Sequence, residues 1–167
     1  SWFAPFQTFT FSPLWFGFIL FMNGLTYRRT GHCLLTDRPR YLPKLFVASA
    51  VFWWFFEYLN RFVQNWYYTG IDEISPFQYF TFATLPFSTV LPAVMRTFDW
   101  LSSYPSAGAG LDTFFRIHIV RRKMVATVTL IVSCIALTGI AIWPNVLFPI
   151  LWLAPLFIIT AMQTLNN

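Results

Sequence analysis

The chain has 167 residues, of which 57% are hydrophobic, 22% aromatic and only 10% charged. Soluble domains carry about 25% charged residues, so this composition excludes an ordinary water-soluble domain and favours a protein embedded in a lipid bilayer. The net charge of +5 comes from 11 lysine and arginine residues against 6 acidic ones. In a membrane protein this excess is typical of cytoplasmic loops that face anionic lipid, and we predict no nucleic-acid partner.

Five apolar stretches, separated by proline, glycine and charged residues, predict an all-α polytopic transmembrane bundle that forms one domain over residues 1–167. Ser-Pro pairs at 12–13 and 75–76 are expected to start the first and third helices, because serine caps a helix and proline is tolerated in its first turn. Gly31 is expected to end the first helix. The predicted spans are residues 13–30, 43–68, 76–97, 124–143 and 146–165.

Internal prolines interrupt two of the predicted spans: Pro86 and Pro92 lie in the third, and Pro149 and Pro155 lie in the fifth. A proline removes one backbone donor and bends a helix, so we expect the third span to kink. The carbonyls that lose their helical donors are expected to find hydroxyls or neighbouring helices, because hydrocarbon offers no hydrogen bonds.

Basic residues are distributed unevenly between the predicted loops. Residues 28–44 and 98–123 are basic, whereas residues 69–75 carry Asp72 and Glu73 and no lysine or arginine. Loops rich in lysine and arginine stay in the cytoplasm, so the alternation predicts an outside N-terminus and an inside C-terminus. An interfacial segment within 98–123 is expected to rest on anionic headgroups. The side chains expected at anionic lipid are Arg28, Arg29, Arg38, Arg40, Lys44, Arg121, Arg122 and Lys123.

Polar residues recur in the second predicted span with the spacing i, i+3, i+4 and i+7, which places them on one helix face. An ionised carboxylate that faced lipid at mid-span would cost about 2.5–3.5 kcal/mol. We therefore expect this face to turn toward other helices, a cavity or a partner subunit. Together with two asparagines it forms the predicted polar cluster of Glu57, Asn60, Arg61, Gln64, Asn65 and Asn23.

Glu57 lies near the middle of its predicted span, and its role has two interpretations. In the structural one, it pairs with Arg61 four residues later and the amides bond to neighbouring helices, contacts worth about 0.6 kcal/mol on average. In the functional one, Glu57 is a candidate catalytic residue, a proton relay or part of a docking seam, since ionisable groups inside membranes often serve function. Trp66, Tyr67 and Tyr68 are expected to end the same helix as an interfacial aromatic belt.

Motifs for metal binding, nucleotide binding and nucleophilic catalysis do not stand out. Both histidines, His32 and His118, lie in or beside basic loops, so we predict no metal site and no cofactor, although a bound lipid, carotenoid or other pigment stays open. Cys33 and Cys134 are expected to be unpaired thiols. The first residue is serine, which leaves open a processed chain or a part of a longer one.

Three stretches, 54-WFFE-57, 66-WYYTGI-71 and 75-SPFQYFTF-82, follow the order of features in the integral-membrane lycopene cyclases of the heterodimeric or fused type, which the chain resembles. The resemblance implies a membrane enzyme for a carotenoid or isoprenoid substrate, with Glu57 as general acid. Where that family carries paired glutamates, this chain has Phe77 and Gln78. The W-x-x-E-x-x-N and NW-x-Y elements are also similar to those of uncharacterised bacterial inner-membrane proteins, which implies a bacterial cytoplasmic membrane.

Three functions therefore stay open. The first, which we favour, is an accessory or structural subunit that packs against other membrane subunits or copies of itself through aromatic faces and the polar cluster. The second is a membrane enzyme that acts on a lipophilic isoprenoid or carotenoid. The third is a small proton-coupled transporter, in which the proline-broken spans line the path.

Overall fold

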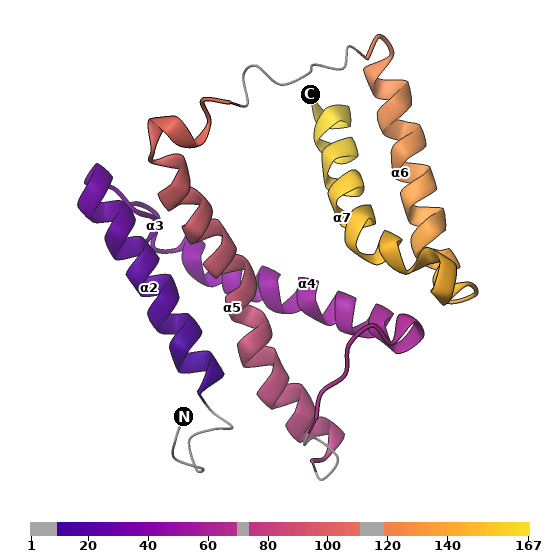
Figure 1. Ribbon diagram of the computed structural model, residues 1–167, viewed down its shortest axis with the longest axis horizontal. Helices are drawn as coiled ribbons and strands as arrows, with labels where there is room; N and C mark the ends of the chain where they lie inside the picture. The colour runs from indigo at the N-terminus through magenta and orange to yellow at the C-terminus, as the bar shows by residue number, and fades with distance from the viewer. Residues whose placement is uncertain (1–9, 70–73, 111–118) are drawn as a thin grey trace. The chain divides into compact units, whose positions relative to one another are not determined.

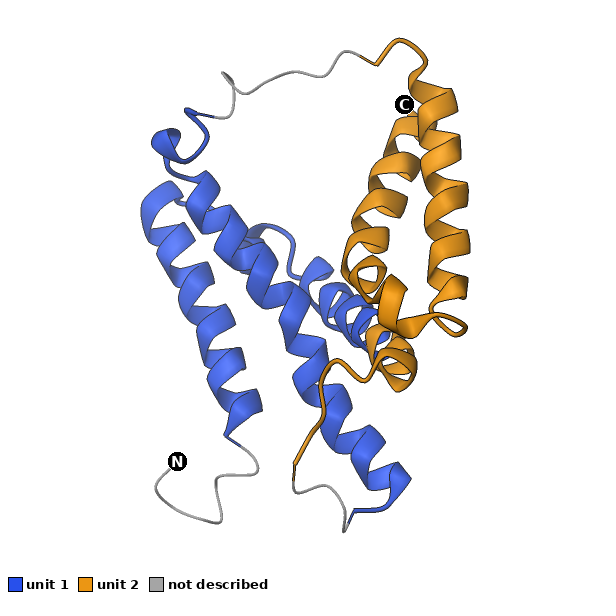
Figure 2. Ribbon diagram, turned by 45° about the vertical axis from the view of Figure 1, so that its right-hand side comes forward, with its two compact units in different colours: residues 1–54, 70–114 blue, residues 55–69, 115–167 orange. Residues whose placement is uncertain are grey.

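A computed structural model describes residues 10–69, 74–110 and 119–167, and within these ranges all regular elements are helices. The residues form two compact units (Figure 2). Unit 1 comprises residues 1–54 and 70–114, and unit 2 comprises residues 55–69 and 115–167. The all-helical fold class is confirmed for the part of the chain that the structure describes.

In the described part of the chain, five long helices lie in the regions of the five predicted spans (Figure 1). Among the described residues, α4, α6 and α7 are long and apolar enough to cross a bilayer. The helices α2 and α5 are also long, at 20 and 27 residues, but hydroxyl, amide and charged side chains make them less apolar. The elements are α2 (Phe11–Thr30), α3 (Leu34–Asp37), α4 (Tyr41–Val63), α5 (Pro76–Ser102), the 3-10 turn η1 (Pro105–Ala107), α6 (Arg122–Gly139) and α7 (Pro144–Asn166).

Unit 1 is built on α2 and α5, which run parallel and side by side (Figure 1). Each helix buries one stripe with the spacing i, i+3, i+4 and i+7, the pattern of a single helix face. The first part of α4 contributes the buried residues Leu42, Leu45 and Ser49. The two stripes are Ile19, Met22, Asn23 and Thr26 on α2, and Thr89, Pro92, Ala93 and Arg96 on α5.

Unit 2 contains the antiparallel hairpin of α6 and α7 (Figure 1). The positions that α6 buries follow a heptad spacing, and small residues dominate the buried positions on both helices. A Cβ built on Gly139 would lie only 2.9 Å from Leu147 Cδ1, so the two helices approach closely at their turn. Small residues allow this approach, as in other packed membrane helices. The hairpin seam consists of Ala126 and Ser133 on α6, Ile140 directly after α6, and Leu151, Ala154 and Ala161 on α7.

Predicted helix starts are confirmed at one position and wrong at another. α5 begins at Pro76, and Ser75 caps it in a capping box, with its hydroxyl accepting a hydrogen bond from the Gln78 backbone at 3.3 Å. α2 begins at Phe11 rather than at residue 13, and its N-cap position is Thr10. Gly31 ends α2 in the left-handed conformation, with φ 76°, as predicted.

The predicted ends of two spans are corrected by the structure. The span 43–68 is too long, because α4 ends at Val63. The span 76–97 is too short, because α5 runs on to Ser102 and shortens the loop predicted over 98–123. Residues 111–118 of the predicted interfacial segment lie outside the described residues.

The turn between α6 and α7 also differs from the predicted spans 124–143 and 146–165. α6 ends at Gly139, and α7 begins directly at Pro144. Glycine weakens the end of a helix, and proline excludes the residue before it from helical geometry. Trp143, the predicted last residue of the fourth span, is therefore not helical, with φ −127° and ψ 62°, and is the last residue of the turn before α7.

Candidate functional site

The carboxy-terminal end of α4 is shaped by the side chain of Asn60, which is only 8% exposed. Its Oδ1 accepts hydrogen bonds from the backbone N–H groups of Asn65 at 2.9 Å and Trp66 at 3.2 Å. Its Nδ2 donates to the Trp66 carbonyl at 2.7 Å. The Asn60 side chain thus binds backbone groups of residues 65 and 66 that would otherwise form helical hydrogen bonds. Gln64, the residue before them, takes up the left-handed conformation, with φ 48°. Asn60 therefore ends the helix and holds a return segment, residues 64–68.

Glu57 lies one turn before Asn60 and binds the same return segment. One carboxylate oxygen, Oε2, accepts hydrogen bonds from the Trp66 indole Nε1 at 3.2 Å and from the Tyr68 hydroxyl at 3.1 Å. The side chain is half-buried. Both donors come from the return segment, so the Glu57 carboxylate fixes the position of two aromatic residues that follow its own helix.

Aromatic rings of unit 2 pack against one another around Trp66, which binds this carboxylate. Trp152 on α7 stacks on Phe56, with ring centroids 5.3 Å apart, and contacts Trp66 at 5.7 Å. Phe56 is also part of the buried core with Leu59. The aromatic residues expected to form a belt at the helix end thus have different environments, because Trp66 packs into unit 2 whereas Tyr67 is 86% exposed.

The remaining members of the predicted polar cluster have other positions. Arg61 is exposed, and a Glu57–Arg61 ion pair is not among the ion pairs between described residues. Gln64 and Asn65 follow α4 instead of lying on its face, and both are exposed. Asn23 belongs to unit 1, where its hydrogen bonds join the Ile19 carbonyl and the Leu35 N–H. Of the four residues predicted to share one face of α4, Gln64 therefore lies outside the helix.

A shallow pocket of about 310 Å³ lies at the same end of α4. Three of its lining side chains are primary amides, and none is charged. Gln64 and Asn65 thus contribute to an open surface pocket with amide character. The lining residues are Val63, Gln64, Asn65, Pro144, Asn145 and Phe148.

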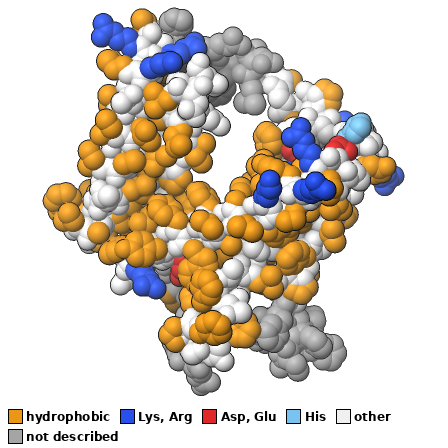
Figure 3. Space-filling view, turned by 180° about the vertical axis from the view of Figure 1, so that it is seen from behind, with side chains coloured by type: hydrophobic (Ala, Val, Ile, Leu, Met, Phe, Trp, Pro, Cys, Tyr) orange, Lys and Arg blue, Asp and Glu red, His pale blue; other side chains and the backbone are white. Residues whose placement is uncertain are grey.

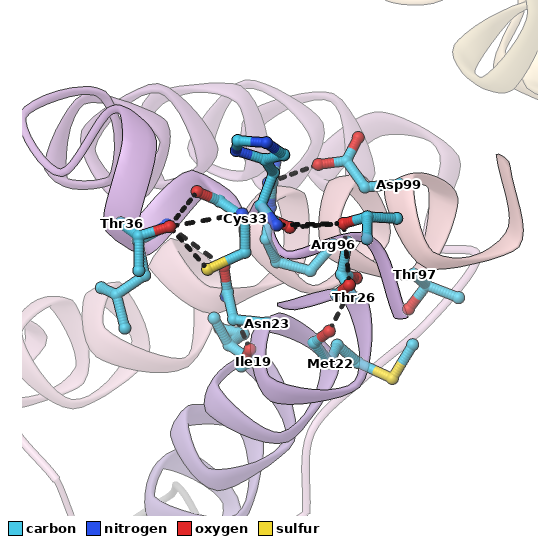
Figure 4. A network of polar contacts seen from close by, with 12 residues as sticks. Ile19, Met22, Asn23, Thr26, Cys33, Thr36, Arg96, Thr97 and Asp99 are labelled. Atoms are coloured by element: carbon cyan, nitrogen blue, oxygen red, sulfur yellow. Dashed lines mark hydrogen bonds and ion pairs between the residues drawn. The ribbon is translucent and has the colours of Figure 1, made fainter. Parts of the chain in front are cut away.

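A buried polar network in unit 1 was not predicted (Figure 4). Arg96 is only 4% exposed and forms an ion pair with Asp99 on the next turn of α5. Its Nε is buried without a hydrogen-bond partner among the described residues. Thr26 lies on the facing stripe of α2 and donates to the Met22 carbonyl at 2.9 Å. Arg96 lies inside the predicted span 76–97, and its spacing from Thr89 and Ala93 places it on the buried stripe of α5.

All eight residues expected at anionic lipid are exposed, and Figure 3 shows basic side chains gathered near a histidine. Arg29 differs from the others, because its guanidinium lies 3.7 Å from the centroid of the Tyr104 ring. Its Nε also donates to the Ser103 carbonyl at 3.1 Å. Arg29 therefore joins the carboxy-terminal ends of α2 and α5. The other residues expected at anionic lipid, which are exposed as Arg29 is, are Arg28, Arg38, Arg40, Lys44, Arg121, Arg122 and Lys123.

These features define a class: a helical protein with three described helices able to span a membrane and with clustered aromatic side chains, which indicates a membrane protein. The described residues contain no group of three or more histidine, cysteine, aspartate or glutamate side chains that could hold a metal ion. No protein-family model, curated protein or solved structure matches the chain.

Proposed function

We propose that the protein is an integral membrane subunit that packs against other membrane helices, or against copies of itself, in a larger complex. Few residues of the three candidate spans are buried. Only 22% of the apolar window of α4, 11% of that of α6 and 17% of that of α7 is buried. In a bilayer, such apolar faces are covered by lipid or by other helices. Large apolar faces on rigid helices can pack against either.

The way the chain uses its polar groups at α4 is the observation that carries this proposal. Glu57 and Asn60 both bind the return segment, the first through Trp66 and Tyr68 and the second through the backbone of Asn65 and Trp66. Side chains engaged in this way shape a rigid end of a helix. That is the role expected of polar residues in a packing subunit.

The proposal is tested by native mass measurement together with photocrosslinking in the membrane of origin. A photoreactive residue replaces Val132, which is 58% exposed on α6, and the control carries it at the exposed residue Ser106 in η1. We expect an assembly heavier than the 19.5 kDa monomer and a discrete protein adduct at position 132 only. A monomer that crosslinks only to lipid at both positions would contradict the proposal.

We also propose that α2 and α5 span the membrane, which gives five spans with the N-terminus outside and the C-terminus inside a bacterial cytoplasmic membrane. At 1.5 Å per residue, a 20-residue helix is about 30 Å long and a 27-residue helix about 40 Å. The parallel course of α2 and α5 within unit 1 agrees with spans that are separated by one returning helix (Figure 1). The alternation of basic and acidic loops supports the orientation.

Thiol labelling from outside intact cells tests this topology. In a chain with Cys33→Ser and Cys134→Ser, we expect Thr69→Cys to react with a membrane-impermeant maleimide. Arg40→Cys, which is exposed in a basic loop, should react only after the membrane is permeabilised. Equal reaction of residues 40 and 69 before permeabilisation would rule out the proposed orientation.

A second candidate function is a membrane enzyme for an isoprenoid or carotenoid. It is favoured by the carboxylate of Glu57, which accepts a hydrogen bond from the Trp66 indole, and by the Trp152 ring that packs against Trp66. Aromatic faces stabilise cations, and an acid beside them suits protonation of a double bond. In a host that makes lycopene, wild-type protein should then change the pigment. Glu57→Gln should abolish the change, and Arg61→Gln, an exposed control on the same helix, should preserve it. Unchanged pigment with the wild-type chain would dispose of this candidate.

A further inference from the structure

Two prolines interrupt the backbone hydrogen bonds of α5. Pro86 and Pro92 lie inside a helix that continues from Pro76 to Ser102. Proline has no N–H, so neither residue donates to the carbonyl four positions earlier. The segment between the two prolines, residues 86–92, therefore has fewer helical hydrogen bonds than the parts of α5 on either side.

A hydroxyl from α4 enters this weakened segment. The Ser49 side chain donates a hydrogen bond to the Phe87 carbonyl at 2.6 Å and accepts one from the Leu91 N–H at 2.9 Å. Residues 87 and 91 are separated by four positions, so they are the two groups that a regular helix would join directly. Ser49 is only 2% exposed. Its hydroxyl thus bridges one turn of a neighbouring helix from inside the packed unit.

Hydroxyls of α5 itself bind other carbonyls around the same segment. Thr89 Oγ1 donates to the Pro86 carbonyl, and Ser88 Oγ donates to the Leu85 carbonyl, both at 2.7 Å. Thr89 is fully buried. These bonds stay within α5, whereas the Ser49 bonds are made from another helix. Side chains inserted in this way are a recognised cause of helix bending.

From these contacts we propose that α5 is a jointed helix, with two stiff parts that meet at residues 86–92, and that Ser49 of α4 holds the joint at one angle. The proposal concerns unit 1 alone and does not depend on the proposed function. Removing the hydroxyl would free the joint to sample several angles. The side-chain hydrogen bond to α4 that remains, from Trp54 Nε1 to Thr84 Oγ1 at 3.0 Å, lies before Pro86 and holds only the amino-terminal part of α5. The side-chain hydrogen bonds of Ser88 and Thr89 lie within α5 itself.

Distance measurement between two spin labels on α5 tests the joint. The labels replace Phe77 and Phe98, which are 78% and 62% exposed and lie on opposite sides of the joint. The protein is the full chain in lipid nanodiscs, with Cys33→Ser and Cys134→Ser. We expect Ser49→Ala to widen the distance distribution about twofold, since the angle is no longer fixed.

Ser88→Ala is the matched control, because the Ser88 hydroxyl bonds only within its own helix. Ser88→Ala should leave the distance distribution as in the wild type. Adding Pro92→Ala to Ser49→Ala should narrow the widened distribution again, because residue 92 regains a backbone N–H. A Ser49→Ala distribution identical to that of the wild type would overturn the proposal. If Ser49→Ala does not fold, Pro86→Ala with Pro92→Ala decides: a narrower distribution supports the joint, and an unchanged one overturns it.

Discussion

Replacing Asn60 with alanine is expected to lower the free energy of unfolding by about 2 kcal/mol. The substitution removes the partner of three backbone groups, the N–H of Asn65 and both the N–H and the carbonyl of Trp66. Each polar group left unpaired in a buried site costs about 1–3 kcal/mol, and partial exposure of the return segment reduces the total. Unfolding in mixed detergent micelles, followed by tryptophan fluorescence, measures the loss.

Asn65→Ala is the matched control for this prediction. Asn65 belongs to the same predicted polar cluster, but its side chain is exposed and only its backbone N–H is bound by Asn60. Its removal should change the free energy of unfolding by less than about 0.5 kcal/mol, as for ordinary surface substitutions. Equal losses for the two alanine variants would show that Asn60 does not hold the return segment.

Ala154→Leu is expected to destabilise the hairpin of α6 and α7 by about 2 kcal/mol. Ala154 is 1% exposed and lies in the hairpin seam, where small side chains let the two helices approach. Three added carbon atoms have no space there, and overpacking of a buried site costs about 1–3 kcal/mol. The same unfolding assay, combined with a fluorescence energy-transfer pair on α6 and α7, would register the loss and the separation of the helices.

Thr160→Leu provides the control, because it adds apolar volume to α7 at an exposed position. It should leave the hairpin intact, since the outer face of a membrane helix accommodates large apolar residues. If both leucine variants behaved alike, close approach at the seam would not be the source of hairpin stability.

The sequence predicts the helices well where their signals are local. Proline and serine at residues 75–76 and glycine at residue 31 act through backbone geometry that any helix shares, and α5 and α2 respect them. The end of α4 could not be predicted in this way. Periodicity continues through residue 68, but Asn60 binds the backbone of residues 65 and 66, and hydrophobic pattern carries no information on such bonds.

The candidate site was predictable in part for the same reason. The helical spacing of Glu57 and Asn60 is real, since both lie on α4, but their partners come from a segment that the pattern assigned to the helix. Arg96 shows the opposite case. It lies inside the predicted span 76–97 but was not among the predicted site residues, although the stripe that it shares with Thr89 and Ala93 faces α2. Burial of a charged group depends on which helices pack together, and no single helix reveals that.

The short, uncharged turn between α6 and α7 bears on how this part of the chain enters the membrane. Residues 140–143 carry no ionisable side chain, whereas Arg121, Arg122 and Lys123 stand just before the hairpin or in its first turn. Moving charge across hydrocarbon is the costly part of translocation. With the proposed topology, the two helices can therefore insert together as a preformed pair, with the basic residues left behind at the cytoplasmic surface.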